Sequence, residues 1–255
     1  MFYQWSSAGD RMVVVSKSGP SDKRTPRSDV RRDTHIRYKF NDTGWFDDKR
    51  SHLWVVDART GVGERTTDGD EWDDTDPQWA PDGKATAFVS DRTGQAYKTS
   101  RNTDVWTIPA EGGALTRISD HSEAEASVRC SPDGKTIAFL GRIWARQHPK
   151  IYLAPASGGA SSQLAVDGLD RLVADMKWTR AKTILFQSGV LGAYHLFRVD
   201  LSARTVSGLL PGERAVRSVS AKAGKTRVPC QRFSGERRLL RHNGSSVENP
   251  RLFHS

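Results

Sequence analysis

Six carboxylate side chains crowd one short segment of this sequence, and clustered carboxylates are ligands that Ca²⁺ accepts. They are Asp68, Asp70, Glu71, Asp73, Asp74 and Asp76. The spacing departs from an EF-hand calcium loop, because Trp72 stands at a ligand position and the turn lacks the required glycine. Acidic runs of this kind have low specificity. We therefore expect an exposed loop between strands and no metal site.

Histidines could act as general bases or metal ligands. The seven are His35, His52, His121, His148, His195, His242 and His254. They show no His-Glu-x-x-His motif and no paired spacing. His52 and His195 each lead into a similar apolar segment, "HLWVVD" and "HLFRVD". This equivalence indicates a repeated structural position rather than chemistry.

The bulk composition predicts a folded protein without cofactor chemistry of its own. The 255 residues include eight Trp and nine Phe, and disordered chains are short of aromatic residues. No window approaches the ~18 apolar residues of a membrane span, and the N-terminus lacks the features of a signal peptide. Cys130 and Cys230 make neither a disulfide framework nor a zinc site. We expect a cytoplasmic protein with no membrane partner and no cofactor.

The net charge of +9 is distributed in blocks. From Arg204 onward there are eleven Lys and Arg against three Asp and Glu, and Lys17 to Lys39 holds eight against three. Such blocks indicate solvated loops. Near the C-terminus Arg232, Arg237, Arg238 and Arg241 surround one aromatic residue, Phe233. Single-strand binding uses several stacking platforms, so we do not expect nucleic acid as a biological partner.

The sequence repeats itself. "PQWAPDGKATAFVSDR" (Pro77 to Arg92) is followed by "VRCSPDGKTIAFLGR" (Val128 to Arg142), and weaker copies surround Gly9, Lys182 and Lys225. The turn lysines Lys84, Lys135, Lys182 and Lys225 are spaced 51, 47 and 43 residues apart. That period is typical of propeller blades. Cys130 stands where the parallel copy has Trp79, so we interpret it as a small structural core residue.

Each copy has the residues of several short strands. Pro-Asp-Gly is suited to a tight turn, because proline fixes one φ and glycine permits a positive one. The turn joins a strand ending at Trp79 or Cys130 to "KATAFVSD" or "KTIAFLGR", and further strands follow, such as "DVWTIPAEGG" and "LTRIS". No copy shows the i, i+3, i+4 spacing of a helix. The sequence predicts an all-β propeller of about five blade-like repeats, incomplete as a ring.

These repeats resemble the WD40-like repeat of bacterial propellers, which occurs in Tol-system proteins and in prolyl oligopeptidase-type serine peptidases. The segment "SDVRRDTHIRYKFNDTGWFDDKRSHLWVVDARTG" (Ser28 to Gly61) is similar to the acylaminoacyl-peptidase branch of that family, as are "DGDEWDDTDPQWAPDG" and "NTDVWTIPAEGG". The resemblance runs from about Trp5 to Arg217. It implies a propeller that packs on a C-terminal α/β-hydrolase domain and limits access to a Ser-Asp-His triad.

No catalytic residue can be assigned in this chain. The nucleophile that the family implies lies in a Gly-x-Ser-x-Gly elbow, and no serine here has both glycines. Ser161 has Gly159 before it but Gln163 after it. Some members of the wider family grip a substrate amine with propeller carboxylates, yet Glu123 and Glu125 in "HSEAEAS" match no such motif. We expect both to be solvated loop residues, and the substrate-binding residues stay unknown.

The repeat pattern decays after Arg217. Pro229 lies inside an expected strand, where it removes a ladder hydrogen bond, and a strand between Cys230 and Gly235 is expected to be missing. We assign residues 1–217 to the propeller repeats and 218–255 to a degenerate last repeat and basic tail, as in a truncated or degenerate gene product.

Two functions follow from these observations. The first is the non-catalytic propeller of an acylaminoacyl-peptidase-like serine peptidase, which packs on a hydrolase domain missing from this chain and gates peptide access. The alternative is a stand-alone propeller that serves as a protein-interaction platform, similar to Tol-system propellers. An active peptidase in this chain alone would need a nucleophile that the sequence lacks.

Overall fold

The structure is a computed structural model whose described residues include no α-helix. It describes residues 3–19, 39–40, 44–45, 49–94, 102–120, 124–142, 148–166, 172–190, 192–209, 214–216, 218–222, 225–232, 237–243 and 247–248. Side chains are described within these ranges up to residue 220, except at 39–40, 44–45 and 214. Several residues singled out above lie outside the described residues: His35, His121, Glu123, Phe233 and His254.

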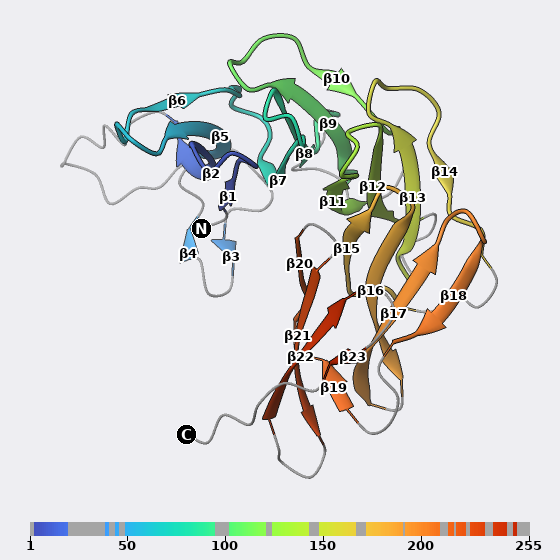
Figure 1. Cartoon of the computed structure of the whole chain (residues 1–255). Helices are drawn as coiled ribbons and strands as arrows, with labels where there is room; N and C mark the ends of the chain where they lie inside the picture. The colour runs from blue at the N-terminus through green and yellow to red at the C-terminus, as the bar shows by residue number, and fades with distance from the viewer. Residues whose placement is uncertain are drawn as a thin grey trace. The chain divides into compact units, whose positions relative to one another are not determined.

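Five antiparallel sheets follow one another along the chain (Figure 1). Sheet 1 has the order β1 (Tyr3–Trp5), β2 (Arg11–Ser18), β5 (Arg50–Asp57), β6 (Gly63–Arg65). Sheet 2 has the order β10 (Thr116–Arg117), β9 (Asp104–Pro109), β8 (Ala85–Ser90), β7 (Asp74–Trp79). Sheet 3 has β11 (Glu125–Cys130), β12 (Thr136–Gly141), β13 (Lys150–Pro155), β14 (Ser162–Gln163). Sheet 4 has β15 (Asp175–Arg180), β16 (Thr183–Val190), β17 (Ala193–Asp200), β18 (Thr205–Gly208).

Sheet 5 has the order β19 (Arg214–Val216), β21 (Lys225–Arg232), β22 (Arg237–Asn243), β23 (Val247–Glu248), and β20 (Ser220–Lys222) also pairs with β21. A separate hairpin joins β3 (Lys39–Phe40) to β4 (Gly44–Trp45). Four four-stranded blade-like sheets and a fifth sheet confirm the predicted all-β propeller architecture.

The repeated turns form as the sequence predicts. Gly83 has φ +71° and its N–H donates to the Ala80 carbonyl over 2.9 Å, and Gly134 has φ +70° with the same bond to Ser131. Gly9 in the first copy has φ +75° and a matching turn. Residues with a side chain rarely adopt this backbone conformation, which explains why these three copies have glycine here. In the fourth copy the strands instead end at Arg180 and resume at Thr183, so Ala181 and Lys182 make the turn.

In four sheets the register pairs equivalent positions of the second and third strands. A serine or glycine near the end of the second strand faces a polar residue near the start of the third strand. The pairs are Ser16 with His52, Ser90 with Asp104, Gly141 with Lys150, and Ser188 with His195. His52 and His195 are each the third residue of their strand, which confirms their predicted equivalence.

The chain forms two compact units, residues 1–128 with 157–160, and residues 129–156 with 161–255. In the first unit the core joins sheets 1 and 2 and includes Val13, Leu53, Trp79, Phe88 and Ile108. In the second unit the main core joins sheets 3 and 4, and a smaller one joins sheet 4 to Val216 and Val219. The predicted boundary after residue 217 stays a prediction.

The expected missing strand in the last repeat is wrong, because β21 continues through Pro229 to Arg232 and β22 pairs along it. The neighbouring strand on the other side is interrupted instead. There β20 pairs with residues up to Arg227 and β19 pairs from Cys230 onward. Proline has no N–H to give to a ladder, and the described pairing on this side of β21 leaves out Val228 and Pro229.

The described part of the chain has no helix of the length and apolar composition that crossing a bilayer requires.

Candidate functional site

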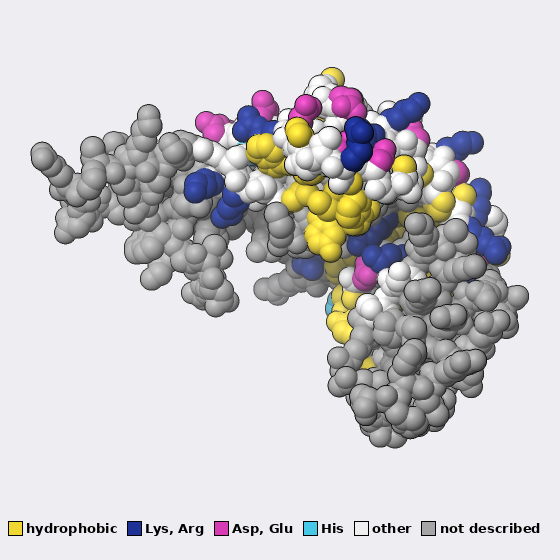
Figure 2. All heavy atoms as spheres, turned by 60° about the vertical axis from the view of Figure 1, so that its left-hand side comes forward, with side chains coloured by type: hydrophobic (Ala, Val, Ile, Leu, Met, Phe, Trp, Pro, Cys, Tyr) yellow, Lys and Arg dark blue, Asp and Glu magenta, His cyan; other side chains and the backbone are white. Residues whose placement is uncertain are grey.

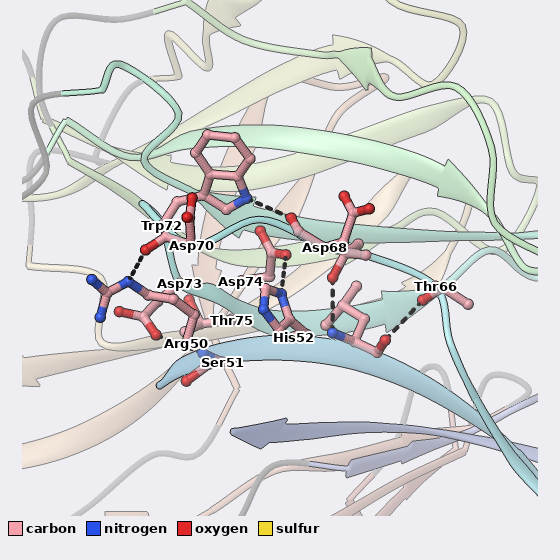
Figure 3. A network of polar contacts seen from close by, with 12 residues as sticks. Arg50, Ser51, His52, Thr66, Asp68, Asp70, Trp72, Asp73, Asp74 and Thr75 are labelled. Atoms are coloured by element: carbon pink, nitrogen blue, oxygen red, sulfur yellow. Dashed lines mark hydrogen bonds and ion pairs between the residues drawn. The ribbon is translucent and has the colours of Figure 1, made fainter. Parts of the chain in front are cut away.

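The expected exposed acidic loop contains one residue that is fully buried. Asp74 is the first residue of β7 and is 0% exposed. Its Oδ1 accepts a hydrogen bond from Arg92 Nη2 over 2.8 Å, and its Oδ2 lies 3.7 Å from His52 Nδ1 on β5 (Figure 3). We call His52, Asp74 and Arg92 the Asp74 cluster. The loop interpretation is therefore wrong for Asp74, which is buried in a strand and paired with the Arg92 guanidinium.

The residues before Asp74 bind the chain to the start of β5. Arg50 Nε donates to the Asp70 carbonyl over 2.8 Å, and the Ser51 N–H donates to Asp73 Oδ1 over 2.7 Å (Figure 3). Trp72 donates to the Asp68 carbonyl over 2.9 Å, and the Arg92 guanidinium stacks 4.7 Å from its ring centroid. The carboxylates of Asp68, Asp70, Glu71 and Asp73 belong to exposed residues, as expected, and Asp76 is half-buried within β7.

A second buried carboxyl group lies at the start of the next sheet. Glu125 is the first residue of β11 and is 2% exposed, so the expected solvated loop residue is wrong. Its Oε2 accepts hydrogen bonds from the Ser119 hydroxyl and from the Val105 N–H. Asp104, on β9 beside Val105, pairs with Arg117 Nη2 over 2.8 Å. We call Asp104, Arg117, Ser119 and Glu125 the Glu125 cluster.

The Glu125 cluster contains two carboxyl groups with raised pKa values. Burial raises the pKa of Glu125 to about 8, with Asp104 contributing in the same direction and the Ser119 hydrogen bond opposing it. Burial also raises the pKa of Asp104 to about 6, against the opposing charge of Arg117. At neutral pH Glu125 is therefore mostly a neutral acid.

The chemistry of both clusters is structural. Each links the first strand of one sheet to the long strand of the sheet before it, and the central side chains are enclosed by protein. Across the described residues, no three His, Cys, Asp or Glu side chains gather in a way that could hold a metal ion.

The remaining predicted positions are dispersed. His148 is exposed, His195 is half-buried in β17, and His242 lies in β22. Cys130 has a half-buried thiol at the end of β11, so it is less enclosed than a core residue, and Cys230 lies in β21.

Sequence reasoning missed the two clusters, although one pattern points to them. Asp74 and Glu125 are 51 residues apart, the same spacing as the turn lysines Lys84 and Lys135. An acidic residue at the same place in two consecutive repeats indicates a structural position rather than a loop. Arg92, Asp104, Arg117 and Ser119 carry no comparable pattern.

Sequence similarity links the chain to a peptidase. Over 131 residues, 51% of this chain, it is 30% identical to the uncharacterized peptidase YuxL of Bacillus subtilis (strain 168). The chain matches no protein-family model. The match covers 18% of YuxL, so the chain spans a small part of that protein's length.

Solved structures of similar fold include a peptidase and TolB. An acylaminoacyl peptidase in complex with Z-Gly-Gly-Phe-chloromethyl ketone superposes with a TM-score of 0.72 at 17% identity, over 97% of this chain and 37% of that one. The chain is a propeller-like β domain distantly homologous to peptidase YuxL. TolB from Acinetobacter baumannii superposes on this propeller domain with a TM-score of 0.57 at 18% identity, over 96% of this chain and 54% of that one. The predicted resemblance to the acylaminoacyl-peptidase propeller is confirmed.

Proposed function

We propose that this chain is the non-catalytic propeller portion of an acylaminoacyl-peptidase-like serine peptidase, and that it packs on an α/β-hydrolase domain and gates peptide access. The coverage carries the proposal: nearly all of this chain matches 37% of a solved acylaminoacyl peptidase. In the full-length peptidases, the matching propellers pack against hydrolase domains. The remaining part of such a protein would supply the serine elbow that this sequence lacks.

Peptides are the proposed substrate class of the whole enzyme. That acylaminoacyl peptidase was solved with a peptide-like chloromethyl ketone, and YuxL is named as a peptidase. In this chain the central carboxyl groups of both clusters are enclosed by protein, so the propeller would act through its shape rather than through chemistry. The alternative, an interaction platform like TolB, has the lower structural similarity, 0.57 against 0.72.

The test compares the hydrolase domain encoded downstream with and without this propeller. With the propeller attached, cleavage of unfolded casein should fall at least about tenfold relative to cleavage of an acylated tripeptide, because only small substrates pass a gate. The chain alone should not react with a serine-directed fluorophosphonate. An unchanged ratio of the two cleavage rates would contradict gating, and labelling of the chain alone would contradict the non-catalytic assignment.

A further inference from the structure

A row of three polar side chains crosses sheet 2. Asp74 of β7 stands opposite Ser90 of β8, and Ser90 stands opposite Asp104 of β9. Residues directly opposite one another share a face of the sheet. Phe88, two residues before Ser90 and on the same face, belongs to the core between sheets 1 and 2. We call Asp74, Ser90 and Asp104 the sheet 2 row, and it lies within the first unit of the chain.

Protein encloses the sheet 2 row. Asp74 and Ser90 are 0% exposed, and Asp104 is 2% exposed. On the described surface of the molecule, Lys and Arg side chains lie among Asp and Glu side chains and meet solvent (Figure 2). The polar atoms of the row have no contact with bulk solvent, so their hydrogen-bond partners must lie inside the protein.

Each member of the row has one oxygen atom without a hydrogen-bond partner among the described residues. These atoms are Asp74 Oδ2, Ser90 Oγ and Asp104 Oδ1. The nearest ring nitrogen of His52 lies 3.7 Å from Asp74 Oδ2, which is longer than a hydrogen bond. An unsatisfied buried polar atom destabilises a folded protein. Three such atoms on adjacent strands therefore indicate a partner that they share.

Contacts within the row cannot satisfy all three atoms. Two are carboxylate oxygens, which only accept hydrogen bonds, and the Ser90 hydroxyl has a single proton to donate. Directly opposite residues have Cβ atoms about 5 Å apart, so the Cβ atoms of Asp74 and Asp104 lie about 10 Å apart across Ser90. The reach of the two carboxyl groups reduces this to about 5 to 6 Å between oxygens turned towards each other, or about two hydrogen-bond lengths. One small molecule fits that span.

A water molecule has the matching donors and acceptors. It can donate one hydrogen bond to Asp74 Oδ2 and one to Asp104 Oδ1, and its oxygen can accept one from the Ser90 hydroxyl. Buried waters in proteins make about three hydrogen bonds, typically to polar groups that have no other partner. We propose that one buried water molecule binds in the sheet 2 row and bridges Asp74, Ser90 and Asp104.

The charges around the row favour water over a metal ion. Asp74 is paired with Arg92 and Asp104 with Arg117, each over 2.8 Å, so arginines already balance both carboxylate charges. A hard cation such as Ca²⁺ takes about 6–8 oxygen ligands, whereas the row offers three oxygens. The described side chains also include no group of three His, Cys, Asp or Glu that could hold a metal ion. The ligand of the row is therefore a neutral molecule.

The equivalent positions of the other sheets lack this combination. They pair Ser16 with His52, Gly141 with Lys150, and Ser188 with His195. None of these three pairs contains a carboxyl group, and Gly141 has no hydroxyl group. Among the four pairs, the one in sheet 2 alone joins a hydroxyl group to a carboxyl group, so the water site is specific to this sheet.

The bridging water joins the two clusters described above. Asp74 belongs to the first cluster and Asp104 to the second, and the water connects them through Ser90. The result is one buried polar network from His52 on β5 of sheet 1 to Glu125 on β11 of sheet 3. This site is independent of the hydrolase contact and of the gating proposed above.

A high-resolution crystal structure of the whole chain tests the site directly. It should show one solvent peak at hydrogen-bond distance, about 2.6–3.2 Å, from Asp74 Oδ2, Ser90 Oγ and Asp104 Oδ1. Direct hydrogen bonds between these side chains without a solvent peak would overturn the proposal. A peak with the many oxygen ligands of a metal ion would overturn it as well.

Oxygen-17 magnetic relaxation dispersion, which counts long-lived internal water molecules, tests the site in solution. Ser90→Val replaces the hydroxyl group with methyl groups at the water position and should lower the count by one. Ser16→Val is the matched control, because Ser16 holds the equivalent position in sheet 1, and it should leave the count unchanged. An unchanged count in Ser90→Val, or an equal loss in both variants, would overturn the proposal. Circular dichroism checks that both variants are folded, and if Ser90→Val is not, the crystal structure of the unsubstituted chain decides.

Discussion

The Asp74 and Glu125 clusters occupy the same place in consecutive repeats and solve the same problem in opposite ways. Both bury a carboxyl group at the first position of a new sheet. Asp74 pairs with Arg92 at 2.8 Å, and the His52 ring lies 3.7 Å from its other carboxylate oxygen. Glu125 instead receives hydrogen bonds from Ser119 and Val105, and burial raises its pKa to about 8. In both repeats a polar residue at the first position of the sheet links it to the sheet before. The link includes an arginine at Asp74 and uses hydrogen bonds from uncharged groups at Glu125.

The largest expected effect comes from breaking the charged link. Asp74→Ala leaves Arg92, whose side chain is 10% exposed, and the buried His52 without their carboxylate. Removing one partner of a buried ion pair costs about 3–5 kcal/mol. Urea denaturation should show that loss, with Asp68→Ala as the control in the exposed part of the same segment. A loss for Asp74→Ala as small as that for Asp68→Ala would mean that the ion pair does not hold the sheets together.

The raised pKa of Glu125 predicts that the stability of the protein depends on pH. Its folded-state pKa of about 8 lies above the ordinary 4.5, so the folded protein keeps a proton that the unfolded chain releases. The contribution of Glu125 to stability is therefore complete below about pH 4.5 and declines as the pH rises to about 8.

Glu125→Gln should remove this decline, which amounts to about 4 kcal/mol between pH 5 and about 8, because each pKa unit corresponds to about 1.4 kcal/mol. Urea denaturation between pH 5 and about 9 measures how the free energy of unfolding changes with pH in the parental protein and in Glu125→Gln. The protein with Asp74→Asn provides the comparison, since it changes the equivalent position without removing Glu125. A parental decline that persists in Glu125→Gln would show that another group causes it.

A smaller effect distinguishes two buried hydroxyl groups, each of which accepts a hydrogen bond from a backbone N–H of a strand. Thr67 Oγ1 accepts a hydrogen bond from the Leu53 N–H over 2.9 Å, and Ser119 Oγ accepts one from Val105 over 2.8 Å. Thr67→Val should cost about 1–2 kcal/mol, because it removes the hydroxyl acceptor of a buried donor. Ser119→Ala should cost less through this bond, since Glu125 also accepts from Val105 over 3.0 Å. Thermal unfolding of both variants measures the order, and the reverse order would contradict this assignment of acceptors.

The smallest effect is expected from Arg117→Ala. Its side chain is 45% exposed where it pairs with Asp104, and exposed ion pairs contribute at most about 1 kcal/mol. Arg92→Ala, in the enclosed pair, should cost several times more. Similar losses in urea denaturation for the two arginine variants would show that burial does not separate the two clusters.

The parts of the fold that repeat could be predicted from the sequence. Pro81 to Gly83 and Pro132 to Gly134 set the turns, and the strands on either side form as the apolar segments predict. Asp74 and Glu125 were misassigned because a local reading finds only acidic residues among turn residues. Asp74 is paired with Arg92, 18 residues further along, and Glu125 accepts hydrogen bonds from Val105 and Ser119, 20 and 6 residues earlier. In the last repeat a strand between Cys230 and Gly235 was expected to be missing, yet β21 continues to Arg232 and β22 pairs along it.

The measurement that tests the proposed function most directly is the sequence of the DNA on the 3′ side of this reading frame. The account predicts a segment related to an α/β-hydrolase domain, with its nucleophile in a Gly-x-Ser-x-Gly elbow between a strand and a helix. Such a segment would establish that this propeller and a peptidase domain are encoded together. Its absence would contradict the peptidase assignment, and the function of the propeller would then have to be sought in the proteins that bind it.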